Sequence, residues 1–344
     1  MNDTTDSLPA EAPRVAAVVQ RRWLLYIVFV LAAILGASYY HLRSDSLFGC
    51  QAGGYSSERY LVYCQTNGYG DFDHGAFWFD LEPEATKAAA SADLMFVGNS
   101  RMQYGFSTGA AHDWLANNGS RYFLLGFAYH PRVMFQRALL GKLSAHARVY
   151  VINLDSFFEE NASVPARYVM TDPQALSNYR VKQFWQSLHR PLCGTFPVLC
   201  GNSYTIFRSK KTGEWQASGL ISATEAPSVE TKIDADMVAR EVLSGNDFLD
   251  KLGVDRRCVI FTLVPTVDAQ VATSAAIAKA LGVEFIAPEV EDLLTFDGSH
   301  LDRDSAERWS GAFFDAAGAR IKDCLGRSGA TAKNQPAAAS RTER

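Results

Sequence analysis

Short apolar runs alternate with segments of helical periodicity between residues 91 and 326. Leu94–Val97 consists of large apolar residues, a pattern typical of a strand buried on both faces of a parallel sheet. Similar runs predict four further strands: Tyr122–Leu125, Val149–Ile152, Cys258–Val264 and Val283–Ile286. Apolar residues at helical spacing predict the helices between them: Thr108–Asn117, one that Pro131 opens, Ala235–Leu252, one that includes Ala275–Leu281, and Ser305–Cys324. The alternation predicts a three-layer α/β/α fold, in which helices cover both faces of a five-stranded parallel sheet.

Two segments do not follow this alternation. Residues 156–232 contain a helical stretch around Gln174–Leu188, but no strand–helix repeat. A segment this long inside an α/β domain is usually functional or an added subdomain. Residues 41–90 are rich in Gly, Ser and Tyr and form a neck before the domain, and their aromatic residues are either a lid over a cleft or ordinary packing. We expect His74, which lies among these aromatics, to be structural.

One apolar run is too long for a strand. Residues 23–40 carry no charge and reach the lower limit for a membrane-spanning helix, about 17 residues. Arginines precede this run and aromatic residues mark its edges: Arg14, Arg21 and Arg22, then Trp23, Tyr39 and Tyr40. This flank predicts an uncleaved anchor in an inner membrane, with residues 1–22 as a disordered cytoplasmic tail and the remainder in the periplasm. A cleaved signal peptide is the alternative, which the poor cleavage site around residues 36–38 disfavours.

The composition of the chain is that of an ordinary globular protein. Of its 344 residues, 48% are hydrophobic and 20% are charged, and the net charge is −4. We find no basic patch interleaved with aromatic residues, so a nucleic-acid partner is not expected. Residues 327–344 are rich in Ala, Ser and Thr and predict a disordered tail.

Six cysteines fit an oxidising compartment. Six allow 15 connectivities, so spacing alone does not choose among them. Two local pairs bracket short loops, and the remaining two cysteines are left for each other: Cys50–Cys64, Cys193–Cys200 and Cys258–Cys324. In the predicted sheet Cys258 begins a strand and Cys324 ends a helix, so both lie at the same end of the domain. No pair has CxxC spacing and no histidine cluster accompanies the cysteines, so we expect neither a metal site nor a cofactor.

Ser100 follows the first predicted strand through a glycine turn at Gly98. Glycine lets the backbone turn sharply, and Ser100 would then lie at the carboxyl end of the strand, where open α/β sheets bind their ligands. A serine in this place is a candidate nucleophile if a base can reach it. Asp297 and His300, in the loop before the last predicted helix, emerge at the same edge of the sheet. Alone they would be an Asp-Gly turn and a surface histidine, but with Ser100 they predict a Ser–His–Asp triad.

These residues resemble the motifs of the SGNH, or GDSL-like, serine hydrolases. Gly98-Asn99-Ser100 stands in the place of the family's first block, and Asp297-Gly298-Ser299-His300 in the place of its last. The resemblance covers about residues 91–325 and implies a flavodoxin-like sheet. It also implies that Ser100 is the nucleophile, that His300 is the general base and that Asp297 orients the imidazole.

The resemblance further implies an oxyanion hole formed by the Ser100 backbone N–H, by Gly126 after the second strand and by Asn153 after the third. Two positions depart from the family pattern: Asn99 replaces the usual acidic residue, and the third block reads Val-Ile-Asn-Leu-Asp instead of Gly-x-Asn-Asp. Asn153 is therefore an oxyanion donor or a structural residue, with Asp155 facing the site instead. Arg101 either binds an anionic substrate group or holds the turn.

Together the anchor and the triad predict a membrane-anchored periplasmic esterase or O-acyltransferase. An acyl group would pass to Ser100 and then to water or to a sugar hydroxyl. The expected partners are an acylated envelope or exopolysaccharide glycan, or a membrane protein that donates the acyl group. The alternative is a catalytically inactive SGNH-fold protein that binds or assembles glycans, an interpretation that the altered third block favours.

Overall fold

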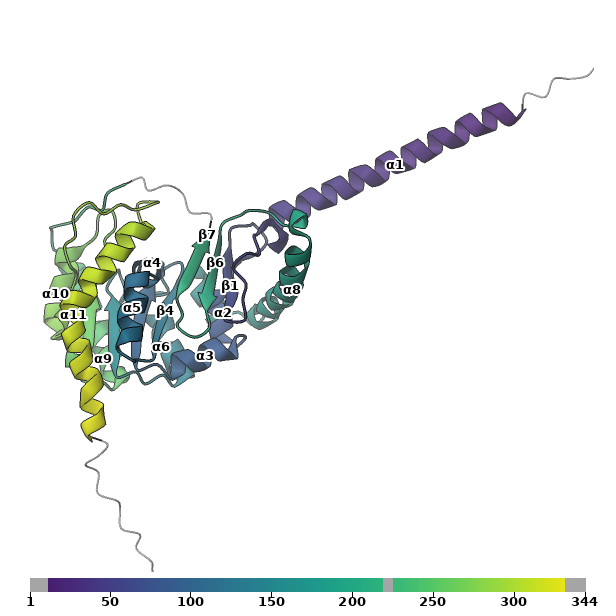
Figure 1. Ribbon diagram of the computed structural model, residues 1–344. Helices are drawn as coiled ribbons and strands as arrows, with labels where there is room; N and C mark the ends of the chain where they lie inside the picture. Colours follow the sequence, from purple (N-terminus) through teal and green to yellow (C-terminus); the bar gives the residue numbers. More distant parts are fainter. Residues whose placement is uncertain (1–11, 219–224, 332–344) are drawn as a thin grey trace, which may run out of the picture.

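The computed structural model of the chain describes residues 12–218 and 225–331. Figure 1 shows an α/β domain from which one long helix, α1 (Ala12–Asp45), projects. The described residues form one five-stranded sheet and one four-stranded sheet. The first sheet positions the candidate site, and the second covers one of its edges.

The five-stranded sheet is parallel throughout. Its strands are β3 (Leu94–Asn99), β4 (Tyr122–Phe127), β5 (Val149–Asn153), β8 (Val259–Thr262) and β9 (Glu284–Phe285). Their spatial order, β4-β3-β5-β8-β9, corresponds to 2-1-3-4-5 when the strands are counted along the chain. This is the flavodoxin-like doubly wound order, which reverses between the first and third strands. The crevice beyond β3 and β5 is therefore the place where such a sheet binds its ligands.

Helices cover both faces of this sheet, as the three-layer prediction requires. Met95 and Val97 of β3 belong to one hydrophobic core, and Leu94 and Phe96 to a second core on the other face. The first core contains residues of α6 (Arg132–Leu143), α9 (Ala235–Leu252) and α10 (Val271–Leu281). The second contains residues of α4 (Ser100–Phe106), α5 (Gly109–Asn117) and α11 (Arg303–Thr331). The all-apolar runs therefore mark strands that are buried on both faces.

Several boundaries differ from the predicted ones. β3 and β4 continue past the predicted ends, Val97 and Leu125, because parallel pairing extends to Asn99 and Phe127. β8 begins at Val259 because the preceding residues form a 3₁₀ helix, η3 (Arg256–Cys258), which the Asp255 side chain caps. β9 is limited to two residues.

The neck and the long insertion fold together into one antiparallel sheet. It consists of β1 (Arg59–Cys64) and β2 (Gly70–Asp71) from the neck, with β6 (Thr205–Ser209) and β7 (Trp215–Ser218) from the insertion. Helices and 3₁₀ turns complete this part of the molecule: η1 (Leu47–Gly49), α2 (Asp73–Trp78), α3 (Pro83–Ala90), α7 (Val164–Thr171), α8 (Ala175–Thr195) and η2 (Pro197–Leu199). Segments that are separate in the sequence thus share one small subdomain.

This subdomain occupies the free edge of strand β4. The Leu124 N–H donates to the Thr212 carbonyl at 2.9 Å, and the Arg208 guanidinium donates to the Leu124 carbonyl at 2.9 Å. Arg208 is fully buried and also binds Asp73 of α2 at 2.7 Å. An edge strand with unpaired backbone groups is prone to association with other chains, and the subdomain removes that edge.

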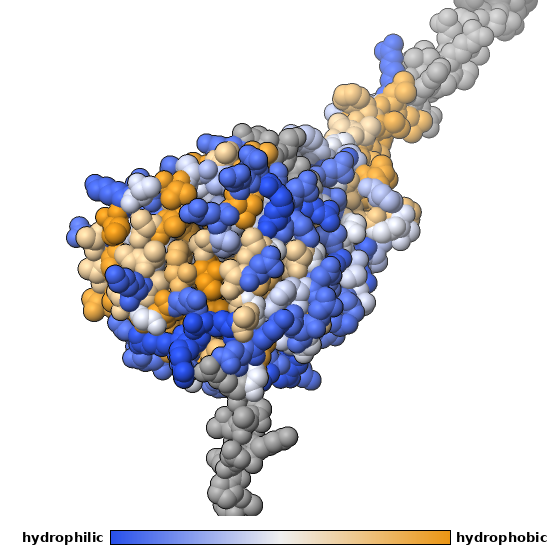
Figure 2. All heavy atoms as spheres, turned by 60° about the vertical axis from the view of Figure 1, so that its left-hand side comes forward, coloured by the Kyte–Doolittle hydropathy of each residue, from blue (hydrophilic) through white to orange (hydrophobic). Residues whose placement is uncertain are grey.

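Helix α1 is long and apolar enough to cross a membrane. Its segment Arg22–Asp45 has 24 residues and contains an 18-residue window with a mean hydropathy of 1.9, none of which is buried within the protein. Figure 2 shows apolar side chains covering the base of α1, whereas apolar and polar side chains are intermixed on the side that carries α10 and α11. Of the predicted terminal tails, residues 12–22 and 327–331 are helical in α1 and α11, and residues 1–11 and 332–344 lie outside the described residues.

The six cysteines form three disulfides: Cys50–Cys64, Cys193–Cys200 and Cys258–Cys324. The first two lie in the neck and the insertion, close to α1. The third joins η3, before β8, to the last helix, and it closes a loop with a sequence separation of 66. On the loop-entropy model such a cross-link stabilises the fold by about 4 kcal/mol.

Candidate active site

Ser100 begins helix α4 directly after strand β3. Asn99 ends the strand and caps the helix, since its side-chain oxygen accepts the Arg101 N–H at 3.0 Å. This cap is the reason that the chain passes from strand to helix without a loop. The Ser100 backbone N–H lies in the first helical turn, where the helix itself offers no acceptor. Ser100 is half-buried at the carboxyl end of the sheet.

The structure brings Ser100, His300 and Asp297 together. His300 Nε2 lies 2.8 Å from Ser100 Oγ, although 200 positions separate the two residues. His300 Nδ1 lies 2.8 Å from Asp297 Oδ2. An ionised carboxylate only accepts, so Nδ1 carries the ring proton and donates it to Asp297. Nε2 is then the acceptor for the Ser100 hydroxyl, which is the tautomer that a general base requires.

Asp297 is held in its ionised form by its surroundings. Burial raises the pKa of the carboxyl, but the hydrogen bond and charge of His300, with the backbone amides of Ser299 and His300, outweigh burial and lower it. These two amides donate to Asp297 Oδ1 at 3.0 and 2.8 Å, so backbone groups of the same loop hold the carboxylate in place. Thr295 pairs with Glu225 in an isolated bridge, which fixes the base of the loop.

Two aromatic rings hold the His300 imidazole. Phe296 stacks on it with ring centroids 5.5 Å apart, and Tyr104 of α4 lies against it at 4.7 Å. The Tyr104 hydroxyl contacts that of Tyr204, which immediately precedes β6. The second sheet thus supports the ring through Tyr104. Tyr104 is a site residue that the sequence pattern did not predict; its only sequence signal is its place one helical turn after Ser100.

A polar network joins the carboxyl ends of β3 and β5 beside Ser100. The Asn99 amide lies 2.5 Å from Asp155 Oδ2 and 3.1 Å from His130 Nδ1. Arg101 binds the other oxygen of Asp155 at 2.5 Å, and its Nε donates to Ser299 Oγ at 3.0 Å. Arg101 therefore ties α4 both to the end of β5 and to the Asp297–His300 loop. This geometry favours the interpretation in which Arg101 holds the turn.

His130 is a second histidine near the site that the sequence did not indicate. It belongs to the loop between β4 and α6, in which Tyr129 and His130 have positive φ, as does Arg132 at the start of α6, with values between 51° and 61°. Non-glycine residues adopt this conformation only at a cost, so surrounding contacts must hold the loop. Burial lowers the pKa of His130, and the charges of Arg101, Arg132 and His300 lower it further against the opposing effect of Asp155.

The two residues proposed to complete an oxyanion hole are both buried in the fold. Gly126 lies inside β4, and a Cβ there would meet Met102 Cε at 2.6 Å and the Asn99 carbonyl at 2.8 Å. Close packing of α4 against β4 therefore explains this glycine without a role in catalysis. Asn153 is 1% exposed, and its Oδ1 accepts the Val264 N–H at 2.9 Å. Its Nδ2 lies 3.5 Å from Asn99 Oδ1, so Asn153 joins β5 to β8 and to the helix cap.

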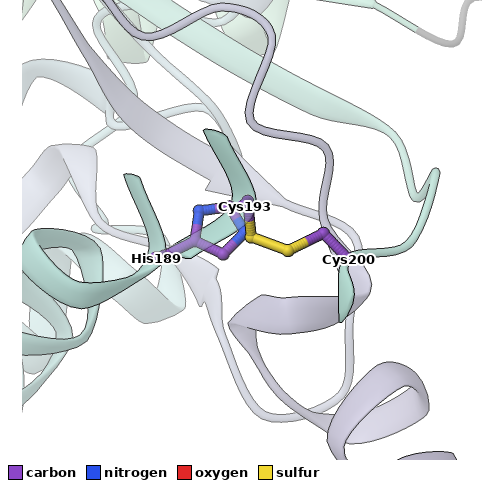
Figure 3. Close-up of side chains that lie close together, drawn as sticks. All are labelled: His189, Cys193 and Cys200. Atoms are coloured by element: carbon purple, nitrogen blue, oxygen red, sulfur yellow. A yellow bond between two sulfur atoms is a disulfide. The ribbon is translucent and has the colours of Figure 1, made fainter. Parts of the chain in front are cut away.

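One cluster of metal-type ligands occurs within residues 12–218 and 225–331: His189, Cys193 and Cys200. Figure 3 shows His189 beside the disulfide that joins the two cysteines. Disulfide sulfurs are not thiolate ligands. His189 Nε2 donates to the Cys50 carbonyl at 3.2 Å, and Nδ1 lies 3.3 Å from the Tyr55 hydroxyl. Burial lowers the pKa of His189 to about 4, so the imidazole is neutral, and both of its nitrogens already have partners within the protein.

His74 is likewise structural. Its ring is fully buried against Phe127 and Phe135, and Nδ1 lies 3.0 Å from Asp71 Oδ1.

The arrangement at the edge of the sheet consists of a hydroxyl, an imidazole that accepts its proton and a carboxylate that fixes the imidazole. These are the groups that nucleophilic acyl transfer needs. Comparisons with protein-family models, with curated proteins and with solved structures found no match to this chain.

Proposed function

We propose that this chain is a membrane-anchored serine esterase or O-acyltransferase with a Ser100–His300–Asp297 triad of the SGNH type. The observation that carries the proposal is the pair of 2.8 Å contacts that His300 makes with Ser100 and with Asp297. The flavodoxin-like strand order and the position of Ser100 at the reversal point of the sheet also support it.

The chemistry proceeds by two displacements. His300 accepts the hydroxyl proton as Ser100 Oγ attacks the acyl carbonyl, and Asp297 stabilises the imidazolium. The C–O bond to the leaving alcohol then breaks, and His300 returns its proton to that alcohol. In the second half, water or a sugar hydroxyl attacks the acyl-Ser100 ester, with His300 again taking and returning the proton. The Ser100 backbone N–H is the proposed donor to the oxyanion; loss of one such donor costs about 3–4 kcal/mol of barrier.

The proposed substrate is an acylated envelope glycan or exopolysaccharide, or an acyl group supplied by a membrane protein. Helix α1 supports this choice, because a chain held at the periplasmic face of an inner membrane meets envelope polymers there. The proposed anchor has its N-terminus in the cytoplasm and its triad in the periplasm.

The experiment is labelling of the full chain in detergent with a fluorophosphonate probe, which reacts only with an activated serine. We expect the wild type to be labelled, Ser100→Ala to be unlabelled and Ser91→Ala to be labelled at the wild-type rate. Ser91 is exposed, and its hydroxyl binds a backbone carbonyl, so it is a matched control. A wild type that resists the probe, or labelling that survives Ser100→Ala, would rule out the enzyme.

A second candidate is a non-catalytic protein that binds or assembles glycans. The observation that favours it is the burial of Gly126 and Asn153, which leaves the Ser100 N–H as the remaining donor among those that the resemblance implies. Absence of probe labelling together with retained glycan binding would select this alternative.

A further inference from the structure

We infer that helix α8 and turn η2 dock on the surface of the bilayer that α1 enters, with anionic phospholipid as the binding partner. This inference goes beyond the triad chemistry and rests on the proposed anchor alone. It concerns a set of exposed apolar side chains, here called the α8 stripe: Val181, Phe184, Trp185, Leu192, Phe196 and Val198.

The α8 stripe is an unpartnered apolar face. Its six side chains are between 37% and 71% exposed. Val181, Phe184, Trp185 and Leu192 recur at helical spacing and therefore lie on one side of α8. Gln183, Ser187 and Arg190 occupy the opposite flank. The residues that α8 buries in the protein, such as Tyr179 and Gln186, form a third face.

The position of the stripe next to α1 indicates what covers it. The Tyr39 hydroxyl donates to the Val198 carbonyl at 3.0 Å, and Arg43 donates to the Cys200 carbonyl at 3.0 Å. Tyr39 is the second-last residue of the uncharged run 23–40, so η2 lies at the level where α1 leaves the membrane. Figure 1 shows α8 beside the base of α1. The stripe is thus already at the height of the lipid surface.

The charge of the segment fits an anionic lipid surface. Residues 175–200 contain no acidic residue, and the exposed Arg180 immediately precedes Val181 of the stripe. The other two basic residues do not face this surface, because Lys182 donates to the Tyr69 and Asp71 carbonyls and Arg190 lies on the opposite flank. Aromatic side chains beside basic ones are typical of helices that lie in the membrane interface.

The stripe also borders a cavity in the described part of the chain. This cavity, of about 860 Å³, lies between the end of α1, at Leu42, and Val181 and Trp185 of α8. Protein atoms therefore do not seal this side of the stripe. Docking on the bilayer would cover it and would hold the domain, and with it Ser100, in one orientation relative to the membrane.

The test is quenching of tryptophan fluorescence by lipids with brominated acyl chains, measured on the full chain in nanodiscs that contain phosphatidylglycerol. We compare the wild type with three conservative variants: Trp185→Phe in the stripe, Trp23→Phe in α1 and Trp215→Phe in the domain interior. Trp215 is 7% exposed and packs on Arg208, so lipid does not reach it. We expect Trp185→Phe and Trp23→Phe each to remove part of the quenched emission, and Trp215→Phe to remove none.

The outcomes separate this inference from the others. If Trp23→Phe removes quenched emission and Trp185→Phe does not, the docking is overturned while the anchor stands. If neither variant removes quenched emission, α1 does not span the bilayer, and both the proposed anchor and the proposed docking fail. Fluorophosphonate labelling of Ser100 is unaffected by either result. Trp185 emission that is insensitive to brominated lipid but changes with the number of chains per disc would assign the stripe to a second copy and overturn the inference.

Replacing phosphatidylglycerol with phosphatidylcholine should weaken the Trp185 quenching, and equal quenching would overturn the anionic preference.

Discussion

Arg101 Nη1 lies 2.5 Å from Asp155 Oδ1, and this ion pair joins the first turn of α4 to the end of β5. Both side chains are largely shielded, with 21% and 12% of their surfaces exposed. Because Arg101 also binds Ser299, one guanidinium links the segment that carries Ser100 to the loop that carries His300. The pair therefore sets the relative position of nucleophile and base.

We expect Arg101→Met to slow fluorophosphonate labelling and to lower the free energy of unfolding by about 1.5–3 kcal/mol, the loss expected for hydrogen bonds to a charged group. The rate of ester hydrolysis by this variant should fall by the same factor for neutral and for anionic esters. Steady-state kinetics on a matched ester pair gives the measurement. A KM increase confined to the anionic ester would instead assign Arg101 to substrate binding.

Asp297→Asn should reduce the labelling rate of Ser100 by about 10³–10⁴-fold, because an amide no longer fixes the imidazole tautomer or stabilises the imidazolium. The fold should be preserved, since the amide oxygen can still accept the Ser299 and His300 N–H groups. Asp304→Asn, at an exposed position in the first turn of α11, is the control. Labelling of Asp297→Asn within tenfold of the wild type would contradict the proposed triad.

Tyr104→Ala removes a ring that lies 4.7 Å from the His300 imidazole. We expect the freed imidazole to lose its alignment and the labelling rate to fall by about 10²-fold, the loss that a displacement of 1 Å produces. Tyr104→Phe keeps the ring and removes only the contact with the Tyr204 hydroxyl, so it should label at nearly the wild-type rate. Equal rates for the Ala and Phe variants would show that the ring does not position His300.

Arg208→Met should strongly destabilise the protein. Asp73 lies 2.7 Å from the buried guanidinium, and the substitution leaves this carboxylate without its charged partner. Breaking such a pair costs about 3–5 kcal/mol. Lys211→Met, which breaks the exposed pair with Glu58, should leave the unfolding temperature almost unchanged, because solvent screens the attraction. Thermal unfolding in detergent measures both, and similar losses for the two variants would contradict the prediction.

Glu241 should make the stability of the protein depend on pH. Burial raises the pKa of its carboxyl to about 7, with the Phe158 amide opposing this effect and the charges of Glu159 and Asp155 adding to it. The unfolded state ionises near pH 4.5 while the folded state keeps the proton, so stability falls as pH rises from 4.5 to about 7. The loss is then complete, at about 3 kcal/mol.

Glu241→Gln removes this dependence. We expect its unfolding temperature to exceed that of the wild type at pH 8 and to match it well below pH 4.5, where both states carry a proton. Glu160→Gln, at an exposed neighbouring position, should leave the unfolding temperature unchanged at both values. If Glu241→Gln and the wild type have the same unfolding temperature at pH 8, the Glu241 carboxyl is solvated and the prediction is wrong.

The sequence alone determined the parallel sheet and the residues of the candidate triad. Strands such as Leu94–Val97 are buried on both faces, so they are uniformly apolar and can be read without knowledge of their neighbours. The carboxyl ends of parallel strands meet at one edge, and that rule placed Ser100 and His300 together before any distance was known. The long uncharged run of α1 can likewise be recognised from adjacent residues alone, because a membrane-spanning helix is defined by its length and hydropathy.

Only the tertiary structure decided how β1 pairs with β6, because its partner strand lies in another part of the chain and short strands of mixed polarity carry no signal for pairing. The same holds for the contacts of Tyr104 with His300 and of Arg101 with Asp155, which depend on side chains brought together by folding. Asn153 shows the physical reason: its residue type fits an oxyanion donor and a structural link equally well. The geometry around it, with Val264 and Asn99 within hydrogen-bond reach, favours the link.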